Sequence, residues 1–266
     1  RAEIPVFEGF GDSNLAWEPD MVVVGKVCSK DHEEVLAAQA RGYELESFPS
    51  ALGKLLLPER RPLVVSGTHG KTTTSTLVAW LLQASQAEPS WLIGGVPENL
   101  PRASHLGKGK GIVLEGDEYD TAFFDKQPKF LHYRPNTCIL TSVEFDHADI
   151  YRDLDHVKES FRKLMGILPT DGLLVVRGDD EGAAEVATLA GCEVWRYGPG
   201  QAWDGRIEGV DTATGTMQFT VLRDGRALGT FSSCMVGEHN LYNQVAAAAA
   251  ATRSGVTPEQ LATGFA

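Results

Sequence analysis

The sequence has 266 residues and a formal net charge of −12, a length that suits one large domain or two smaller ones. The acidic balance disfavours a nucleic-acid surface, because phosphate backbones bind clustered Lys and Arg, but a few backbone N–H groups and one lysine can still hold a small anion. No apolar run is long enough to span a membrane and no signal peptide is visible. The four scattered cysteines form no C-x-x-C pair, which indicates a reducing cytoplasm rather than a disulfide framework or a zinc site.

Apolar runs alternate with helical patterns along most of the chain. The predicted strands are 20–25, the first part of 43–57, 63–67, 111–116, the first part of 137–149, 172–180 and 193–198. The predicted helices, in chain order, are 31–42, the last part of 43–57, 71–86, 156–168 and 239–255. Strands that alternate with helices predict an α/β fold with a mostly parallel sheet and flanking helices.

Two segments depart from this alternation. Residues 58–62, PERRP, are charged and flanked by prolines, which predicts a linker and a domain boundary. Residues 205–236 alternate with period two around an Asp224–Gly225 turn, which predicts a small antiparallel β portion made of hairpins. The helix predicted over 71–86 has one apolar stripe, formed by Leu77, Trp80, Leu81 and Ala84.

The stretch VVSGTHGKTTTSTL, residues 64–77, resembles a phosphate-binding loop that is two residues short. The usual pattern G-x-x-x-x-G-K-[ST] would require a glycine where Val65 stands. A surface lysine after an ordinary turn is the alternative. The position between an apolar strand and a helix favours a phosphate loop. Gly67 and Gly70 would let backbone N–H groups approach phosphate, Lys71 would reach the β- and γ-phosphates, and the Thr72 hydroxyl would face Mg²⁺.

Acidic residues follow two of the predicted strands, at the edge where ligands bind in open α/β sheets. EGDEYD (115–120) places Glu115 nearest the strand, where it could hold Mg²⁺ shared with a nucleotide; a solvated acidic loop is the alternative. EFDHAD (144–149) surrounds His147 with carboxylates that could orient its ring, although a lone histidine is often structural. We expect His147 to belong to the site.

The stretch GEHNLYNQ, residues 237–244, places Asn240 and Asn243 at the start of a predicted helix. Asn240 could cap that helix. Alternatively, both amides could recognise an adenine edge, since an amide donates and accepts hydrogen bonds together. The spacing alone leaves the two interpretations open.

Together these segments resemble the Mur ligase superfamily, the ATP-dependent ligases that build bacterial cell-wall peptides. The short loop of that family, G-T-x-G-K-[TS], matches GTHGKTT (67–73), which explains the missing first glycine. Glu115, SVEFDHAD (142–149) and HNLYN (239–243) match its other motifs in order. The resemblance implies ATP and Mg²⁺ as cofactors and a loop whose nucleotide-binding residues are Gly67, Thr68, His69, Gly70, Lys71, Thr72 and Thr73.

The family's chemistry implies roles for these residues. The first step is attack of a carboxylate on the γ-phosphate of ATP to give an acyl phosphate, which an incoming amine then displaces. The resemblance assigns catalysis to Lys71, Glu115 and His147 and metal binding to Thr72, Glu115 and His147. It also implies that Asn240 and Asn243 fix the adenine.

Within the family, THGKTTT resembles the branch that acts on UDP-N-acetylmuramate. EGDEYDTAFFDKQPKFLHYRP (115–135) resembles the recycling ligase that attaches the murein tripeptide L-alanyl-γ-D-glutamyl-meso-diaminopimelate. The L-alanine-adding ligase of peptidoglycan biosynthesis is the alternative. Folylpolyglutamate-type ligases and a non-catalytic nucleotide-binding module are further alternatives.

The resemblance also implies a domain plan and some departures from it. Residues 1–58 resemble the later part of a Rossmann-like UDP-substrate-binding domain, and residues 59–266 a P-loop ATPase-like central domain. We expect a piece of a longer protein whose C-terminal ligase domain is absent and which is inactive alone. Ser142 stands where many relatives have Asn. A carbamylated lysine is not identifiable, since Arg162 lies at the comparable distance from His147 and Lys158 and Lys163 are only its neighbours.

Overall fold

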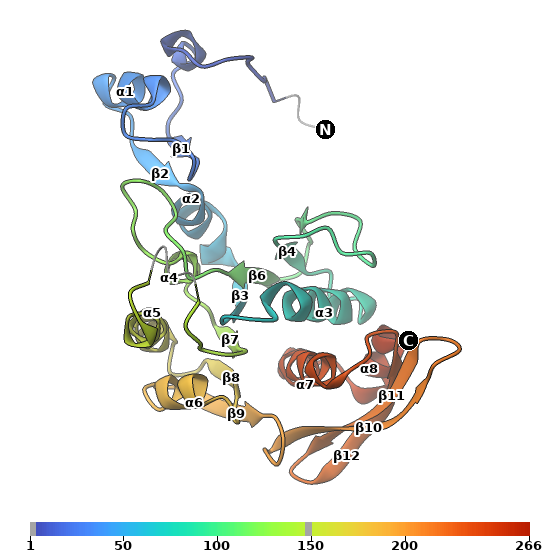
Figure 1. Ribbon diagram of the computed structural model, residues 1–266. Coiled ribbons are helices and arrows are strands. Elements are labelled where there is room, and N and C mark those ends of the chain that lie inside the picture. The colour runs from blue at the N-terminus through green and yellow to red at the C-terminus, as the bar shows by residue number, and fades with distance from the viewer. Residues whose placement is uncertain (1–3, 147–150) are drawn as a thin grey trace.

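A large sheet runs through the central and C-terminal parts of the computed structural model, which describes residues 4–146 and 151–266 (Figure 1). Among these residues the sheet has ten strands in the order β12-β11-β10-β9-β8-β7-β3-β6-β4-β5. They are β3 (Arg61–Ser66), β4 (Ser90–Leu92), β5 (Ser104–His105), β6 (Gly111–Gly116), β7 (Thr137–Leu140), β8 (Leu173–Arg177), β9 (Glu193–Tyr197), β10 (Trp203–Asp211), β11 (Thr216–Arg223) and β12 (Arg226–Ser233). Strands β4, β6, β3, β7, β8 and β9 are parallel. The predicted α/β class with a mostly parallel sheet is confirmed.

Helices cover both faces of this sheet (Figure 1). One face carries α3 (Lys71–Ala84), α7 (Glu238–Arg253) and α8 (Pro258–Phe265), and the other carries α4 (Lys129–Tyr133), α5 (Leu154–Ile167) and α6 (Glu181–Ala187). Successive residues of β3 separate accordingly: Leu63 and Val65 join the first core, whereas Val64 joins the second. This alternation follows from the period-two geometry of a strand that is buried on both sides.

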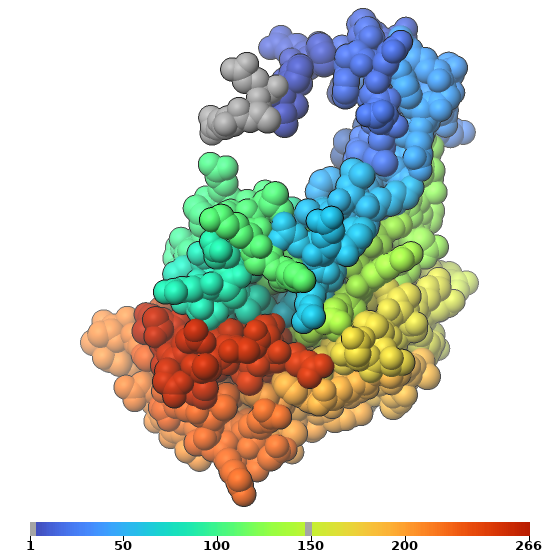
Figure 2. All heavy atoms as spheres, turned by 180° about the vertical axis from the view of Figure 1, so that it is seen from behind, coloured from blue at the N-terminus to red at the C-terminus, as the bar shows by residue number. Residues whose placement is uncertain are grey.

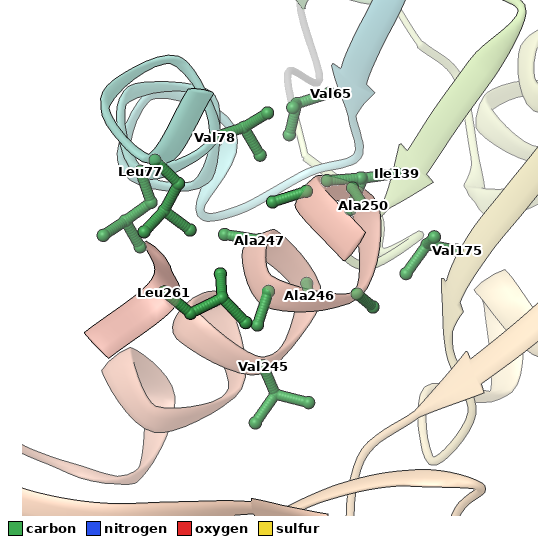
Figure 3. Close-up of a cluster of buried hydrophobic side chains, with 14 of the residues drawn as sticks. Val65, Leu77, Val78, Ile139, Val175, Val245, Ala246, Ala247, Ala250 and Leu261 are labelled. Carbon is green, nitrogen blue, oxygen red and sulfur yellow. The ribbon is translucent and has the colours of Figure 1, made fainter. Parts of the chain in front are cut away.

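The alanine run of α7 lets this helix approach the sheet closely (Figure 3). Ala246, Ala247 and Ala250 are fully buried in one core with Val65 and Ile139. Small side chains are required because α7 lies between α3 and the strands. Neighbouring atoms already surround each alanine methyl group and leave no room for a larger side chain. For the same reason α3 buries more than the predicted stripe, including Val78, Ala79 and Leu82.

The N-terminal region forms its own small sheet. Its elements are η1 (Asp12–Leu15), β1 (Val22–Val24), α1 (Glu33–Ala40), β2 (Leu45–Ser47), α2 (Phe48–Leu55) and η2 (Leu57–Glu59). Strands β1 and β2 are parallel and pair only with each other among the described residues. Figure 2 shows this region at one end of the molecule, away from the hairpin strands β10–β12. A hydrogen bond of 2.8 Å from Ser47 Oγ to Asp125 Oδ2 connects it to the central region.

Several details differ from the sequence predictions. The PERRP segment is no extended linker, because η2 leads almost directly into β3 and Arg60 donates to the carbonyls of Gly107 and Gly109. The hairpins are continuous with the parallel sheet, since β10 pairs with β9 at Trp203 and Tyr197. The sequence analysis did not predict the short elements β4, β5, α4 and α6, or helix α8. In the described part of the chain, no helix combines the length and apolar character needed to cross a bilayer.

The packing of α7 gives a stability prediction. We expect Ala247→Leu to lower the free energy of unfolding by about 1–3 kcal/mol, because the larger side chain must displace buried neighbours. The control is Ala262→Leu, on the exposed side of α8, which should have little effect. Urea denaturation of both variants measures the difference, and equal stabilities would contradict the close packing of α7.

Candidate functional site

Three neighbouring strands end at one edge of the sheet and bring their following segments together. Ser66, the last residue of β3, pairs with Gly116 of β6 and with Leu140 of β7. The Ser66 hydroxyl also donates to the Gly116 carbonyl over 2.7 Å. The candidate phosphate loop (residues 67–70), the acidic segment after β6 and residues 141–146 therefore lie side by side.

Gly67 allows the candidate phosphate loop to lie against the segment after β7. Its φ is +131°, and a Cβ atom there would lie 2.2 Å from Thr141 Oγ1 and 2.8 Å from the Ser142 amide nitrogen. The Thr68 and His69 amides both donate to Ser142, to its carbonyl over 3.0 Å and to its hydroxyl over 3.1 Å. Ser142, noted as a departure from the family pattern, thus holds the loop.

These contacts limit which backbone N–H groups are available to bind an anion. The N–H groups of Thr68 and His69, two residues that the resemblance assigns to nucleotide binding, are engaged by Ser142. Helix α3 begins at Lys71 with Gly70 as its N-cap in the left-handed region, at φ +78°. The first-turn N–H groups of a helix have no intrahelical acceptor, and the helix dipole makes that end positive. The start of α3, including Thr72 and the partly buried Thr73, therefore offers first-turn N–H groups of the kind that bind anions.

Lys71 is buried and paired with Glu118, a carboxylate that the sequence analysis did not single out within the acidic segment. Its ammonium lies 3.1 Å from Glu118 Oε2 and 2.6 Å from the Gly67 carbonyl. The side chains of Lys71 and Glu118 are only 9% and 2% exposed. Burial raises the pKa of Glu118, while the charge of Lys71 opposes that shift. Only its membership of the acidic segment after β6 could have marked Glu118 from the sequence.

Thr72 and Glu115, the two predicted Mg²⁺ ligands that the structure describes, lie together. The Thr72 hydroxyl donates to Glu115 Oε1 over 2.7 Å, and the Gly94 amide donates to Glu115 Oε2 over 2.8 Å. Gly94 follows β4, so the segment after this strand also fixes the carboxylate. A hydroxyl and a carboxylate are hard oxygen donors, and Mg²⁺ commonly takes one or two carboxylates together with substrate phosphates. The donor set therefore fits Mg²⁺.

The predicted histidine lies outside the described residues. His147 and the neighbouring Asp149 fall in the stretch 147–150, so their positions are not described. Of the same motif, Glu144 lies beside the loop, where its amide donates to Thr68 Oγ1 over 2.9 Å. Its carboxylate lies 3.6 Å from His69 Nε2. Among the described residues no group of three or more His, Cys, Asp or Glu side chains could hold a metal.

Helix α7 brings one of the two predicted asparagines to the loop. Asn243 Oδ1 accepts from the Thr74 hydroxyl over 3.3 Å and would lie 2.9 Å from a Cβ atom at Gly70. Asn240 instead donates to the Val236 carbonyl over 2.9 Å. It is not the N-cap considered as an alternative, because α7 begins at Glu238 and Gly237 caps it without a side-chain hydrogen bond.

A cavity of about 390 Å³ extends from the candidate phosphate loop toward β8 and α7. Its lining includes His69 and Gly70 of the loop, His239 and Asn243 of α7, and Arg177 at the end of β8. The Arg177 guanidinium is oriented by a 2.9 Å hydrogen bond to Asp179 Oδ2 and lies 4.2 Å from the ring centroid of Tyr242. The sequence analysis did not identify this arginine, although it lies two residues before Asp179 in the predicted segment 172–180.

The three residues named beside the position expected for a carbamylated lysine all lie on α5. Lys158 and Arg162 of α5 both donate to Glu185 of α6, over 2.6 and 2.9 Å. Lys163 is exposed.

A larger cavity, about 670 Å³, lies away from the site, at the opposite edge of the sheet beside Arg61 and Gly111.

Comparison with known proteins identifies the family. Residues 65–251 match the Mur ligase middle domain, so the chain belongs to the Mur ligase family. It is 37% identical over 259 residues to the UDP-N-acetylmuramate--L-alanyl-gamma-D-glutamyl-meso-2,6-diaminoheptandioate ligase of Escherichia coli (strain K12), covering 97% of this chain and 56% of that relative. It is 35% identical over 241 residues to the UDP-N-acetylmuramate--L-alanine ligase of Burkholderia lata, covering 90% and 50%. The chain thus spans about half the length of these relatives.

A solved structure extends the similarity to three dimensions. The crystal structure of UDP-N-acetylmuramate:L-alanyl-gamma-D-glutamyl-meso-diaminopimelate ligase from Neisseria meningitides superposes with a TM-score of 0.88 at 35% identity. The superposition covers 97% of this chain and 82% of that chain. The similarity therefore includes the N-terminal region as well as the large sheet.

The backbone at Gly67 gives a testable requirement. We expect Gly67→Ala to lower the free energy of unfolding by about 1–3 kcal/mol from backbone strain alone, with a further cost from the collision with Thr141 and Ser142. Gly111→Ala is the matched control, because a Cβ atom there meets nothing within 4 Å. Thermal unfolding of both variants measures the effect, and a Gly67→Ala protein as stable as the control would show that the loop is not held as described.

Proposed function

We propose that this chain is the nucleotide-binding part of an ATP-dependent amide ligase. In the proposed reaction, L-alanyl-γ-D-glutamyl-meso-diaminopimelate is joined to UDP-N-acetylmuramate through an acyl phosphate, with formation of ADP and phosphate. The observation that carries the proposal is the buried Lys71 at the start of α3 beside the Thr72–Glu115 pair. The similarity to ligases named for this tripeptide supports the choice of peptide.

The proposed roles follow from position and charge. The first-turn amides of α3 and the Lys71 ammonium would bind the phosphates and offset the charge that spreads over them during phosphoryl transfer. Thr72 and Glu115 would hold Mg²⁺, which supplies further charge neutralisation when bound. Asn243 borders the cavity beside the loop, so we place the adenine there. The role proposed for His147 rests on its motif alone.

A third cavity supports a place for the carboxylate substrate. It has about 310 Å³ and lies between the end of β1 and the end of β6, with Gly25, Lys26, Glu115 and Lys129 in its lining. The Lys129 ammonium lies 2.7 Å from Asp117 Oδ2. Because this cavity shares Glu115 with the nucleotide side, a carboxylate bound in it would lie near the transferred phosphoryl group. We propose it as part of the UDP-N-acetylmuramate site.

L-alanine is the second candidate for the incoming group. Ligases named for L-alanine reach 35% identity with this chain, close to the 37% of the tripeptide ligase. The two functions share the same proposed nucleotide chemistry and differ in the amine that is accepted. The geometry of the described site supports both equally, and the higher identity and coverage favour the tripeptide.

Loss of the buried lysine tests the nucleotide chemistry. In the full-length protein we expect Lys71→Ala to reduce ATP-dependent ligation at least about 100-fold, the scale of removing one preorganised charge-stabilising donor. The fold should survive, because Glu118 can take up a proton once the lysine is gone. Lys163→Ala on the exposed side of α5 is the control. Phosphate release measures turnover and circular dichroism measures folding; turnover unchanged by Lys71→Ala would refute the assignment.

A substrate comparison tests the choice of amine. Full-length protein supplied with ATP, Mg²⁺ and UDP-N-acetylmuramate should form product with the tripeptide at least about tenfold more efficiently than with L-alanine, since a site built for a polar ligand rejects one that lacks its groups. Mass spectrometry of the two products gives the result directly. Preference for L-alanine would support the biosynthetic ligase instead.

A further inference from the structure

The Lys71 ammonium is saturated by acceptors from the protein itself. An ammonium has three N–H donors, and three acceptor groups surround this one: the Gly67 carbonyl at 2.6 Å, the Thr68 carbonyl at 3.3 Å and the Glu118 carboxylate at 3.1 Å. A phosphate that binds Lys71 must therefore replace one of these partners. The two carbonyls belong to the loop that carries the lysine, whereas Glu118 comes from the segment after β6.

Glu118 is the partner that most resembles a phosphate. It presents two oxygens to the ammonium, at 3.1 and 3.4 Å, and its side chain is almost completely buried. The Tyr151 hydroxyl donates to the Glu118 carbonyl over 2.6 Å, which fixes the backbone that carries the carboxylate. In a buried site, two anions close to one ammonium repel each other strongly. The carboxylate and a γ-phosphate therefore compete for Lys71.

We propose that Glu118 is an internal competitor of the nucleotide, which holds Lys71 before binding and yields it to the γ-phosphate of the triphosphate. This inference rests on the proposed function, since it takes the loop as a nucleotide site. After phosphoryl transfer the γ-phosphate leaves Lys71, and Glu118 takes it back. Glu118 therefore lowers triphosphate affinity and is a positioning residue for Lys71.

The test compares two charge-removing substitutions in the same acidic segment of the full-length protein. Glu118→Gln removes the competing charge but keeps a side chain of equal size. Asp120→Asn removes a charge two residues away that pairs with Lys126 over 2.7 Å rather than with Lys71. Dissociation constants for the non-hydrolysable triphosphate AMPPNP and for ADP are measured by calorimetry with Mg²⁺, and thermal unfolding checks that each variant is folded.

We expect Glu118→Gln to bind AMPPNP about fivefold or more tightly than the unmodified protein, the scale of removing one nearby like charge. Affinity for ADP, whose β-phosphate still reaches Lys71, should increase less than affinity for AMPPNP, and Asp120→Asn should leave both unchanged. Unchanged or weaker AMPPNP binding by Glu118→Gln, or equal tightening by Asp120→Asn, would overturn the proposal. Failure of the unmodified protein to bind AMPPNP would instead count against the proposed function.

A crystal structure of the unmodified full-length protein with Mg²⁺ and AMPPNP gives a measurement that needs no variant. The distance from Lys71 Nζ to the nearest Glu118 oxygen should increase from 3.1 Å to beyond about 4 Å, outside hydrogen-bonding range. An ion pair that persists at its present length while the phosphates are bound would overturn the proposal.

Discussion

The parallel register of β3, β6 and β7 is the constraint on which the rest of the site depends. Because Ser66 pairs with both Gly116 and Leu140, the three strands end together and their following segments must share one small space. The loop fits there only because Gly67 has no side chain to collide with Thr141 and Ser142. The register thus fixes the position of Lys71 and Thr72 relative to the acids after β6.

Burial then separates the roles of two glutamates that stand three residues apart. Glu115 is partly exposed and is held by Thr72 and Gly94 at the mouth of the site. Glu118 lies deeper, against the lysine ammonium. In water the two side chains would be nearly equivalent, but a buried carboxylate is costly unless it is paired and hydrogen-bonded. The surroundings of each carboxylate therefore decide whether it faces a hydroxyl and an amide or a lysine.

The sequence predicted the alternating elements well, because buried strands of a parallel sheet are continuous apolar runs and long helices show a clear periodicity. It predicted the strand–loop–helix turn at Gly67–Lys71 and the strand 111–116, which contains Glu115 near its end. It missed short elements such as α4 and β5, which are too brief to carry a period. It also treated the hairpins as a separate portion, although β10 joins the sheet through a single pair with β9.

The sequence by itself determined the local features from which we predicted the site residues, namely glycines, a lysine and acids at strand ends. Only the tertiary structure decided their partners: Lys71 with Glu118, Thr72 with Glu115, and the loop amides with Ser142. These contacts join segments that are far apart in the sequence. Their geometry depends on strand register and on burial, and neither can be predicted from a short stretch of residues.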